Sequence, residues 1–506
     1  MDSIIFFVLV FLSGTVYSVS TAMRIPANQP ETINLGVRIL RPVYAVIPAT
    51  RDGYKNATVV MTIWLKRVGA SNGPYDMPHQ SKDAIRMIVW VDSPSNLFLR
   101  TNGHLLLPTE MDQWWPNLHL ETGSPGPLLP VLLETSGYHY RRVWGAGQRP
   151  YSFRVDLPDG VGDCFKIVEA SYPMHKNTFC LPPAAQESVC ANLAPPHVHT
   201  NKNPALYTVI GPIRHPESTR EWSAYYSKVS GILVNYVTYQ VAMGASGLLL
   251  YADELMRKYF GENQELMALV VRGQLRLIEW DMPERAHKDT DGVGRPLGYN
   301  YDQGLVSSHI LLALSSCGAN LLVLIGDLDE HIYTPKARGR RPRPWTRCMG
   351  LMEGNSTDPV TTHRIKRFNT ETTKVDPSAE NDLWAVPGTL NARVNGDGTI
   401  DTIPNGAVPH PLAHYDAVHS EPLPINQVKQ VSLPAAWVVL FWVHEGVPLY
   451  GRTNMVPHQC MSILHIVNLF RGRHTTLVNG NLAQGKRYFR HWMFLPESAN
   501  ASLWQL

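Results

Sequence analysis

The stretch Leu321 to Pro335 has the sequence LLVLIGDLDEHIYTP, and it decides the expected fold. The apolar run Leu321–Ile325 leads directly into Gly326 and Asp327. A short, uniformly apolar run bounded by turn residues is typical of a strand buried on both faces, as in the middle of a parallel sheet. Acidic side chains at the carboxyl end of such a strand lie where open α/β sheets bind ligands. The stretch therefore predicts a ligand site at the edge of a buried sheet.

The acids of this stretch are Asp327, Asp329 and Glu330. Two Asp side chains separated by one residue can together reach a hard cation and the sugar of a nucleotide. Oxygen ligands suit Mg²⁺ or Mn²⁺, and such a cation clamps a diphosphate. The bare Asp-x-Asp-Glu pattern is more often a solvated turn, so the hypothesis depends on the elements before it.

The residues before this stretch alternate between strand-like and helix-like patterns. Short apolar runs predict strands, and apolar residues at spacings of three and four predict helices. Asp253 stands where it would cap the second helix. This alternation predicts a parallel, doubly wound α/β sheet with right-handed crossovers. The expected elements are strands at 206–210, 247–251 and 275–280 and helices at 221–243, 253–260 and 302–316.

Residues 24–195 are β-rich in pattern. Strand-like runs at 59–65, 85–91 and 97–100 are separated by Gly, Pro, Asn and Ser clusters, which predicts a sandwich-like domain. Trp114, Trp115 and His119 lie in a loop-like segment of this region. Such aromatic side chains either stack on sugar rings or pack a core, and packing is the commoner use. The Pro-rich segment 183–204 is the expected boundary to a second domain, 204–495.

The segment after the acidic stretch turns basic and irregular. Residues 336–347 contain six basic residues and no acid, which indicates a solvated loop or a contact for anions. Residues 369–425 are rich in Pro, Asn and Gly, so we expect a long insertion at about 336–433. Order resumes with an apolar run at 437–443, interpreted as a buried strand that ends near Glu445.

Composition and the N-terminus bear on partners and compartment. The 506 residues include 45 basic and 42 acidic ones, a net charge of +3, which is too balanced to indicate nucleic acid as a partner. The apolar run at 4–12 is too short to span a membrane, so residues 1–22 are expected to be a signal peptide or, as the competing interpretation, an anchor. Glycosylation acceptor sequences begin at Asn56, Asn355 and Asn500.

The chain has six cysteines, none in C-x-x-C spacing, so disulfides are expected rather than a zinc site. We expect one pairing within the cluster from Cys164 to Cys190, whereas Cys317, on a predicted helix, is interpreted as a core thiol.

Taken in chain order, these elements resemble glycosyltransferase family 92. About half of the chain carries the resemblance, from 206 to 335 and in the tail, and the β-rich region is similar only in architecture to the sugar-binding sandwich of plant galactan synthases. The matching features are the Trp222 helix, the strand Gly244–Tyr251 with Asp253, the end of a strand at Glu279-Trp280, Gln303, Asp327-Leu-Asp329-Glu330, Arg452 with Pro457 and His465, and His491-Trp492.

The resemblance implies a GT-A fold, a UDP-sugar donor that is usually UDP-galactose, a Mn²⁺ ion (or Mg²⁺) and inversion at the anomeric carbon. It also implies roles for individual residues. These are Asp327 at the ribose or the metal, Asp329 and His465 at the metal, Tyr251 and Asp253 near the uridine, Gln303 near the donor sugar or ribose, and His491 among the donor-binding residues.

Inversion requires a base for the acceptor hydroxyl, normally Asp or Glu. Glu445, Asp302 and Glu330 are the candidates, and we favour Glu445. The chain departs from the family in having His331 in place of an aromatic residue, Arg452 in place of Lys and a longer basic segment after the motif. These departures bear on the acceptor more than on the donor reaction.

The sequence thus predicts a metal-dependent transferase of the secretory pathway, in the Golgi lumen or membrane or secreted, acting on a glycan or polysaccharide. The alternative is a secreted, non-catalytic carbohydrate-binding protein on a transferase scaffold. A third interpretation, a pyrophosphorylase-like enzyme on the same sheet, conflicts with the secretory start, since such enzymes work in the cytosol.

Overall fold

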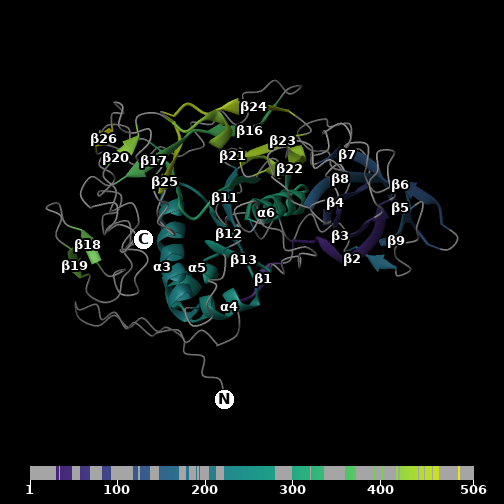
Figure 1. Ribbon diagram of the computed structural model, residues 1–506, viewed down its shortest axis with the longest axis horizontal. Helices are drawn as coiled ribbons and strands as arrows, with labels where there is room; N and C mark the ends of the chain where they lie inside the picture. The colour runs from purple at the N-terminus through teal and green to yellow at the C-terminus, as the bar shows by residue number, and fades with distance from the viewer. Residues whose placement is uncertain are drawn as a thin grey trace, which may run out of the picture.

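The structure is a computed structural model of the chain, and its elements are shown in Figure 1. It describes residues 30–33, 35–47, 57–68, 83–92, 118–123, 126–136, 148–169, 178–181, 190, 193, 204–211, 213, 222–279, 299–318, 321–334, 359–371, 392–394, 400–402, 417–419, 422–442, 444–448, 451–458, 460–466 and 488–490.

A large, mostly parallel sheet forms the centre of the molecule, which confirms the predicted α/β class. Its neighbouring strands β1, β13, β12, β11 and β14 are all parallel, and β21 runs antiparallel between β14 and β16. The strand order is β1 (Thr32–Ile33), β13 (Leu275–Glu279), β12 (Gly247–Ala252), β11 (Ala205–Ile210), β14 (Leu321–Ile325), β21 (Lys429–Ser432), β16 (Val360–Ile365) and β24 (Arg452–Met455).

Helices cover both faces of this sheet because its strands alternate apolar side chains to either side. Leu248 and Leu250 pack with α3 (Trp222–Ala242), α4 (Glu254–Gly261) and α5 (Gln264–Val271), whereas Leu249 and Tyr251 pack with α6 (Tyr299–Ala313). The predicted strands and helices of 206–325 are therefore confirmed in type. The sequence missed α5, and α6 begins and ends three residues earlier than expected.

At β11 the chain changes the side of the sheet edge to which it adds strands: β12 and β13 lie on one side of β11, and β14 lies on the other. From β11 the chain passes by α3 to β12 and on to β13, then returns over the other face by α6 to β14, on the opposite side of β11. In open α/β sheets such a switch point leaves a crevice outside the carboxyl ends of the two central strands. Here these ends are Gly211, after β11, and Gly326, after β14.

Residues before the linker form two antiparallel sheets that share one hydrophobic core, at the right of Figure 1. Ile63 and Met87 of the first sheet and Phe165 of the second are buried in that core. One sheet contains β2 (Arg38–Ile47), β3 (Ala57–Val68), β4 (Ala84–Asp92), β8 (Gln148–Asp156) and β7 (Leu132–Ser136), and the other contains β10 (Phe179–Cys180), β9 (Cys164–Glu169), β5 (Leu118–Glu121) and β6 (Leu128–Pro130).

The first N-terminal sheet also packs by its other face against α6, which lies between the two halves of the molecule in Figure 1. The Trp64 ring meets His309 of α6 edge-on, with centroids 5.5 Å apart, and Lys66 Nζ donates a hydrogen bond to the Ala313 carbonyl at the end of α6. Arg86 lies over the Trp437 ring, 4.0 Å from its centroid. The sheet is thus buried on both faces, which explains why β3 and β4 are almost uniformly apolar in sequence.

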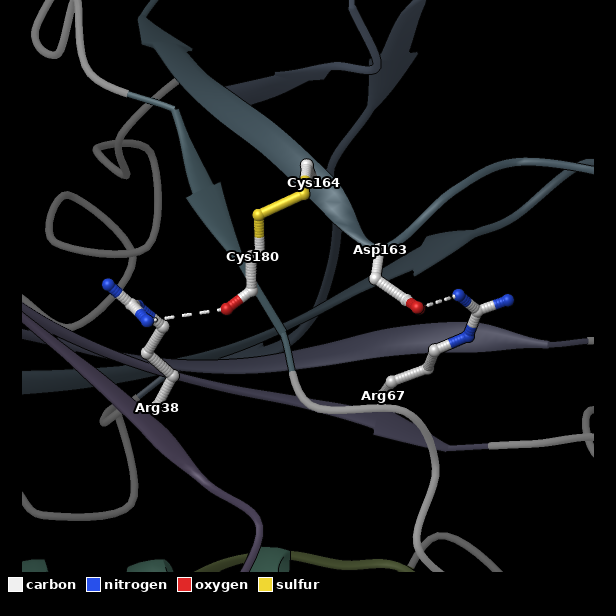
Figure 2. The surroundings of a disulfide bond; sticks show 5 residues. All are labelled: Arg38, Arg67, Asp163, Cys164 and Cys180. Carbon is white, nitrogen blue, oxygen red and sulfur yellow. Dashed lines mark hydrogen bonds and ion pairs between the residues drawn. A yellow bond between two sulfur atoms is a disulfide. The ribbon is translucent and has the colours of Figure 1, made fainter.

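Two disulfides join described residues, and Figure 2 shows the surroundings of the first. Cys164–Cys180 ties β9 to β10, as expected for the cysteine cluster, with Arg38 donating to the Cys180 carbonyl over 3.3 Å. The second, Cys190–Cys317, ties the segment after the β-rich part to the turn beyond α6. The interpretation of Cys317 as a core thiol is therefore wrong.

Within the segment 336–433, which was expected to be an insertion, several described stretches form strands of the sheets. β16 and β21 complete the large sheet, and β17 (Arg367–Glu371) lies in a second sheet beside β25 (Ser462–Ile466). Thr362 and His363 of β16 and Gln430 of β21 are buried polar residues. Because these strands bury polar side chains, they lack the apolar pattern by which a buried strand is predicted. The second sheet also contains β15 (Glu330–Tyr333), β20 (Ala417–His419) and β26 (Tyr488–Arg490), and β18 (Ala392–Val394) pairs with β19 (Ile400–Thr402).

The apolar run 437–443 forms half of a hairpin instead of a strand of the large sheet. β22 (Val438–Trp442) lies along α6 and pairs with β23 (Glu445–Pro448), with Trp442 opposite Glu445. Glu445 therefore begins the return strand of the hairpin and does not end a buried strand.

Several expectations lie outside the described residues: the N-terminal segment 1–22, the strand at 97–100, Trp114 and Trp115, and the basic segment 336–347. His119 lies in β5 and is half-buried, in a strand and not a loop. Among the described residues, no helix combines the length and apolar character that crossing a membrane requires.

Lys66 predicts a pH dependence of folding stability. Burial lowers its pKa to about 7 in the folded chain, against about 10.4 in an unfolded one. The unfolded chain binds more protons between these values, so the free energy of unfolding should rise with pH in this window. Lys66→Met should flatten that rise, measured by urea unfolding from pH 7 to 9.5. If the free energy of unfolding changes with pH in parallel for wild type and Lys66→Met, the assignment is contradicted. Lys258→Met, at an exposed lysine, is the control.

Candidate functional site

The acidic stretch forms a closed turn between β14 and β15. The Glu330 amide donates to the Asp327 carbonyl over 3.0 Å, and the Asp327 amide donates to Glu330 Oε2 over 3.0 Å. The carbonyl of Asp329 accepts from the Ile466 amide of β25 over 2.8 Å. Backbone bonds thus hold the three acids at the carboxyl end of β14, where the sequence predicted a site.

Glu330 is buried and bound to two cations. Arg367 Nη1 lies 2.6 Å from Glu330 Oε1, and Lys429 Nζ lies 2.9 Å from Glu330 Oε2. Burial alone would raise the pKa of Glu330, but the charges of Lys429 and Arg367 hold it well below its usual value. Glu330 therefore stays ionised, and both of its oxygens are engaged.

Asp327 faces the crevice and is also held at both oxygens. Gln303 Nε2 donates to Oδ1 over 2.8 Å, and Lys429 Nζ lies 2.9 Å from Oδ2. Burial lowers the pKa of Lys429, but Asp327 and Glu330 raise it further, so the ammonium stays charged. The Asp327 carboxylate remains 28% exposed, and it lines a pocket with Gly211, Gln303, Gly326 and Lys429. The pocket thus lies at the switch point of the sheet.

Asp329, in the turn before β15, faces His465 of the neighbouring strand β25. His465 Nε2 lies 3.5 Å from Asp329 Oδ2, while His465 Nδ1 bonds to Asn369 Oδ1 over 2.9 Å. Asp329 Oδ1 is buried and has no hydrogen-bond partner among the described residues. Ligand atoms of Asp329, Glu330 and His465 all lie within 4.8 Å of one another.

This arrangement fits a divalent cation. Because the Asn369 oxygen can only accept, His465 donates from Nδ1, which leaves the Nε2 lone pair directed toward a carboxylate. Two hydrogen-bond acceptors this close repel each other unless a cation or a proton lies between them. Neighbouring ligands of one octahedral ion lie about 3 Å apart, so the separation of His465 Nε2 and Asp329 Oδ2 suits a metal ion. Asp329 and His465 are therefore the residues that would hold a metal, whereas Asp327, the third predicted ligand, lies outside the group of potential ligands. Glu330 is the third member of this group, and its oxygens are already engaged by Lys429 and Arg367.

The predicted donor residues divide between the site and the core. Gln303 lies in the pocket, and its Oε1 is buried without a partner among the described residues. The hydroxyl of Tyr251 instead lies 2.7 Å from His309 Nδ1, inside the core under α6. Asp253 caps α4 by accepting from the Met256 amide over 2.8 Å, as its position predicted. His491 lies outside the described residues.

The structure assigns backbone positions to the two remaining base candidates. Asp302 precedes Gln303 on α6, and Glu445 begins β23, where the neighbouring Gly446 amide donates to Gln430 Oε1 over 2.7 Å. Of these two elements, α6 contributes residues to the pocket lining. Glu330, the third candidate, has both oxygens engaged by cations.

Sequence reasoning missed Lys429, Arg367 and His444. All three interact with Glu330, but each lies about 40 to 115 residues from the acidic stretch in a segment without apolar periodicity. A single Lys, Arg or His in such a segment carries no signal of its own, because its role depends on which strand its segment joins.

No family model and no curated protein matches this chain. Its function is therefore inferred from the geometry of the site and from the residues that form it.

Removing either of the two facing side chains should weaken metal binding. We expect Asp329→Asn and His465→Ala each to weaken Mn²⁺ binding at least about tenfold, because each removes one ligand atom, as loss even of outer-shell partners costs about that much. Asp327→Asn should retain the affinity within a few fold, since both Asp327 oxygens bond to protein groups. Isothermal titration with MnCl₂ measures this. Loss in Asp327→Asn with retention in Asp329→Asn would reverse the assignment.

Lys429 should be required for stability. Lys429→Met leaves Asp327 and Glu330 with one cation fewer in a buried setting, a change that typically costs about 3–5 kcal/mol. The double variant Glu330→Gln/Lys429→Met should recover part of the loss, because the two effects are coupled. Urea unfolding checks both, with exposed Lys258→Met as control. Strictly additive costs would show that the pair is not coupled.

Proposed function

We propose that this protein is a metal-dependent, inverting glycosyltransferase that moves a hexose, with galactose as the first candidate, from a UDP-sugar to a glycan or polysaccharide. The observation that carries the proposal is the facing pair Asp329 and His465 beside Asp327, at the switch point of the sheet. A cation held there would lie next to a pocket with unfilled hydrogen-bond acceptors.

The topology supports a nucleotide-binding, GT-A-like sheet. Its parallel strands follow the spatial order third, second, first, fourth in β13, β12, β11 and β14. Doubly wound sheets with this order bind nucleotides at the reversal. The resemblance to glycosyltransferase family 92 leads to the same expectation by an independent route.

The pocket provides acceptors suited to the ribose of a nucleotide. Gln303 Oε1 has no partner among the described residues, and Asp327, fixed by Gln303 and Lys429, keeps lone pairs toward the pocket. Adjacent ribose hydroxyls are donors that could fill both. Gly211 and Gly326 line the same pocket.

Departure of the nucleoside diphosphate develops negative charge that the site must stabilise. When bound, a divalent cation supplies that stabilisation. Asp329 and His465 would hold it, and Glu330 fixes the turn by accepting from the Asp327 amide. Lys429 remains charged at the pocket wall and orients Asp327, and its charge opposes the rise that burial causes in the pKa of Asp327.

The proton of the acceptor hydroxyl requires a base at this edge. Glu330 is poorly suited because Arg367 and Lys429 occupy its oxygens. Asp302 on α6 and Glu445 on β23 remain the proposed bases.

The two disulfides support a secretory location. Disulfides form and persist in oxidising compartments such as the lumen of the secretory pathway. An enzyme of the Golgi lumen or membrane, or a secreted one, fits this chemistry and the apolar N-terminal run.

Donor hydrolysis tests the function. Wild-type protein with Mn²⁺ should release UDP from UDP-galactose, and Asp329→Ala should lower the rate by at least about a hundredfold, because a metal contact stabilises the transition state by several kcal/mol. Exposed Glu265→Gln, on α5, is the matched control and should keep the wild-type rate. Mass spectrometry of a panel of nucleotide sugars identifies the donor consumed. Equal rates in wild type and Asp329→Ala would end the proposal, and sugar binding without any turnover would favour the non-catalytic alternative.

A further inference from the structure

Strand β17 supplies two side chains to the site. Arg367 and Asn369 are two residues apart, so strand alternation directs both to one face of the second sheet. Arg367 Nη1 donates to Glu330 Oε1 over 2.6 Å, and Asn369 Oδ1 lies 2.9 Å from His465 Nδ1. One face of β17 therefore holds both an acid and the imidazole of the group that could bind a metal.

The register of the strands explains why Asn369 meets this imidazole. Asn369 is the direct partner of His465 in the parallel pair of β17 and β25, and Thr370 donates through Oγ1 to the His465 carbonyl over 3.1 Å. On the other side of β25, Glu330 of β15 is the antiparallel partner of His465. The backbone of His465 is thus fixed between two strands, and Asn369 is the neighbour that contacts its ring.

Two distances from the His465 ring locate its proton. A neutral imidazole carries one proton, on either Nδ1 or Nε2. The 2.9 Å from Nδ1 to Asn369 Oδ1 is the length of a hydrogen bond, whereas the 3.5 Å from Nε2 to Asp329 Oδ2 is longer than a usual N–H···O bond. Asp329 Oδ1 also has no hydrogen-bond partner among the described residues. The proton therefore lies on Nδ1, and Nε2 presents a lone pair to Asp329.

The other tautomer would close the site. With the proton on Nε2, His465 would donate a hydrogen bond to Asp329, and a metal ion could bind only by displacing that proton. A ligating imidazole needs a free lone pair, and its second nitrogen usually donates to a partner that fixes the ring. The acceptor that Asn369 offers to Nδ1 thus favours the form that can bind a metal over the form in which the two side chains bond to each other.

We propose that Asn369 is a positioning residue of the site, which fixes the tautomer of His465 with the Nε2 lone pair toward Asp329 and so keeps the pair open for a divalent cation. The identity of that cation as a cofactor rests on the proposed function. The tautomer does not, because it is a property of the chain without any metal.

Nitrogen NMR of the metal-free full chain, labelled with ¹⁵N-histidine, reads the tautomer directly, because protonated and unprotonated ring nitrogens resonate far apart. His465→Ala assigns the signals by their loss. Wild type should carry the His465 proton on Nδ1. Asn369→Leu removes the acceptor at similar size, so the proton should move toward Nε2. Isothermal titration with MnCl₂ should then show an affinity at least about tenfold lower, as for loss of an outer-shell partner.

Two further variants separate positioning from a structural role. Asn369→Asp keeps an acceptor at the same place, so it should keep the proton on Nδ1 and bind Mn²⁺ at least as tightly as wild type does. Thr370→Val is the matched control on the same strand, because it removes the bond to the His465 carbonyl and leaves the ring contact. The tautomer in Thr370→Val should be that of wild type, whatever the variant loses in stability.

The outcomes separate this inference from the proposed function. A proton on Nε2 in wild type overturns the inference, and so does an Asn369→Leu variant that keeps either the wild-type tautomer or the wild-type Mn²⁺ affinity. A change of tautomer in Thr370→Val or in Asn369→Asp would show that the packing of β17 matters instead of the acceptor, which also overturns it. If the tautomers are as expected but wild type does not bind Mn²⁺, the metal assignment of the proposed function fails, while the control of the tautomer by Asn369 stands.

Discussion

The structure depends on one buried ionic cluster, in which Glu330 is bound by Arg367 and Lys429. The Glu330 carboxylate could not remain ionised in this buried turn without such cations, because an unpaired buried charge is costly. The cations come from β17 and β21, strands that follow the acids by 37 and 99 or more residues in the chain. The cluster thus joins the parallel half of the sheet to the later strands, and it orients Asp327 and Asp329 at the same time.

The second constraint is the burial of α6 between two sheets. One side packs on β11, β12 and β14, and the other meets Trp64 and Lys66 of the N-terminal sheet. Because Gln303 on this helix holds Asp327, the N-terminal sheet supports the site through α6 as well as through the hairpin that carries His444. The β-rich part is therefore packed against the α/β part.

The site could be predicted where it depends on local pattern, and not where it depends on pairing between distant segments. The strand LLVLI and the acids after it indicated the location, and the repeated strand and helix patterns indicated the sheet that creates a crevice there. The assignment of His465 to the metal came from the resemblance. Tyr251, assigned to the donor by that resemblance, turns its hydroxyl into the core toward His309, because alternation along β12 directs it to the α6 face.

The sequence by itself determined the α/β class, the elements from β11 to β14, the cap at Asp253 and the acids at the strand end, because each follows from spacing within one segment. Only the tertiary structure decided that β16 and β21 complete the sheet, that Cys317 pairs with Cys190, and that Lys429 and Arg367 neutralise Glu330. The physical reason is that buried polar strands carry no apolar period, and an ion pair or disulfide between distant residues leaves no mark on the local sequence. Such partners become visible only when the chain brings them together.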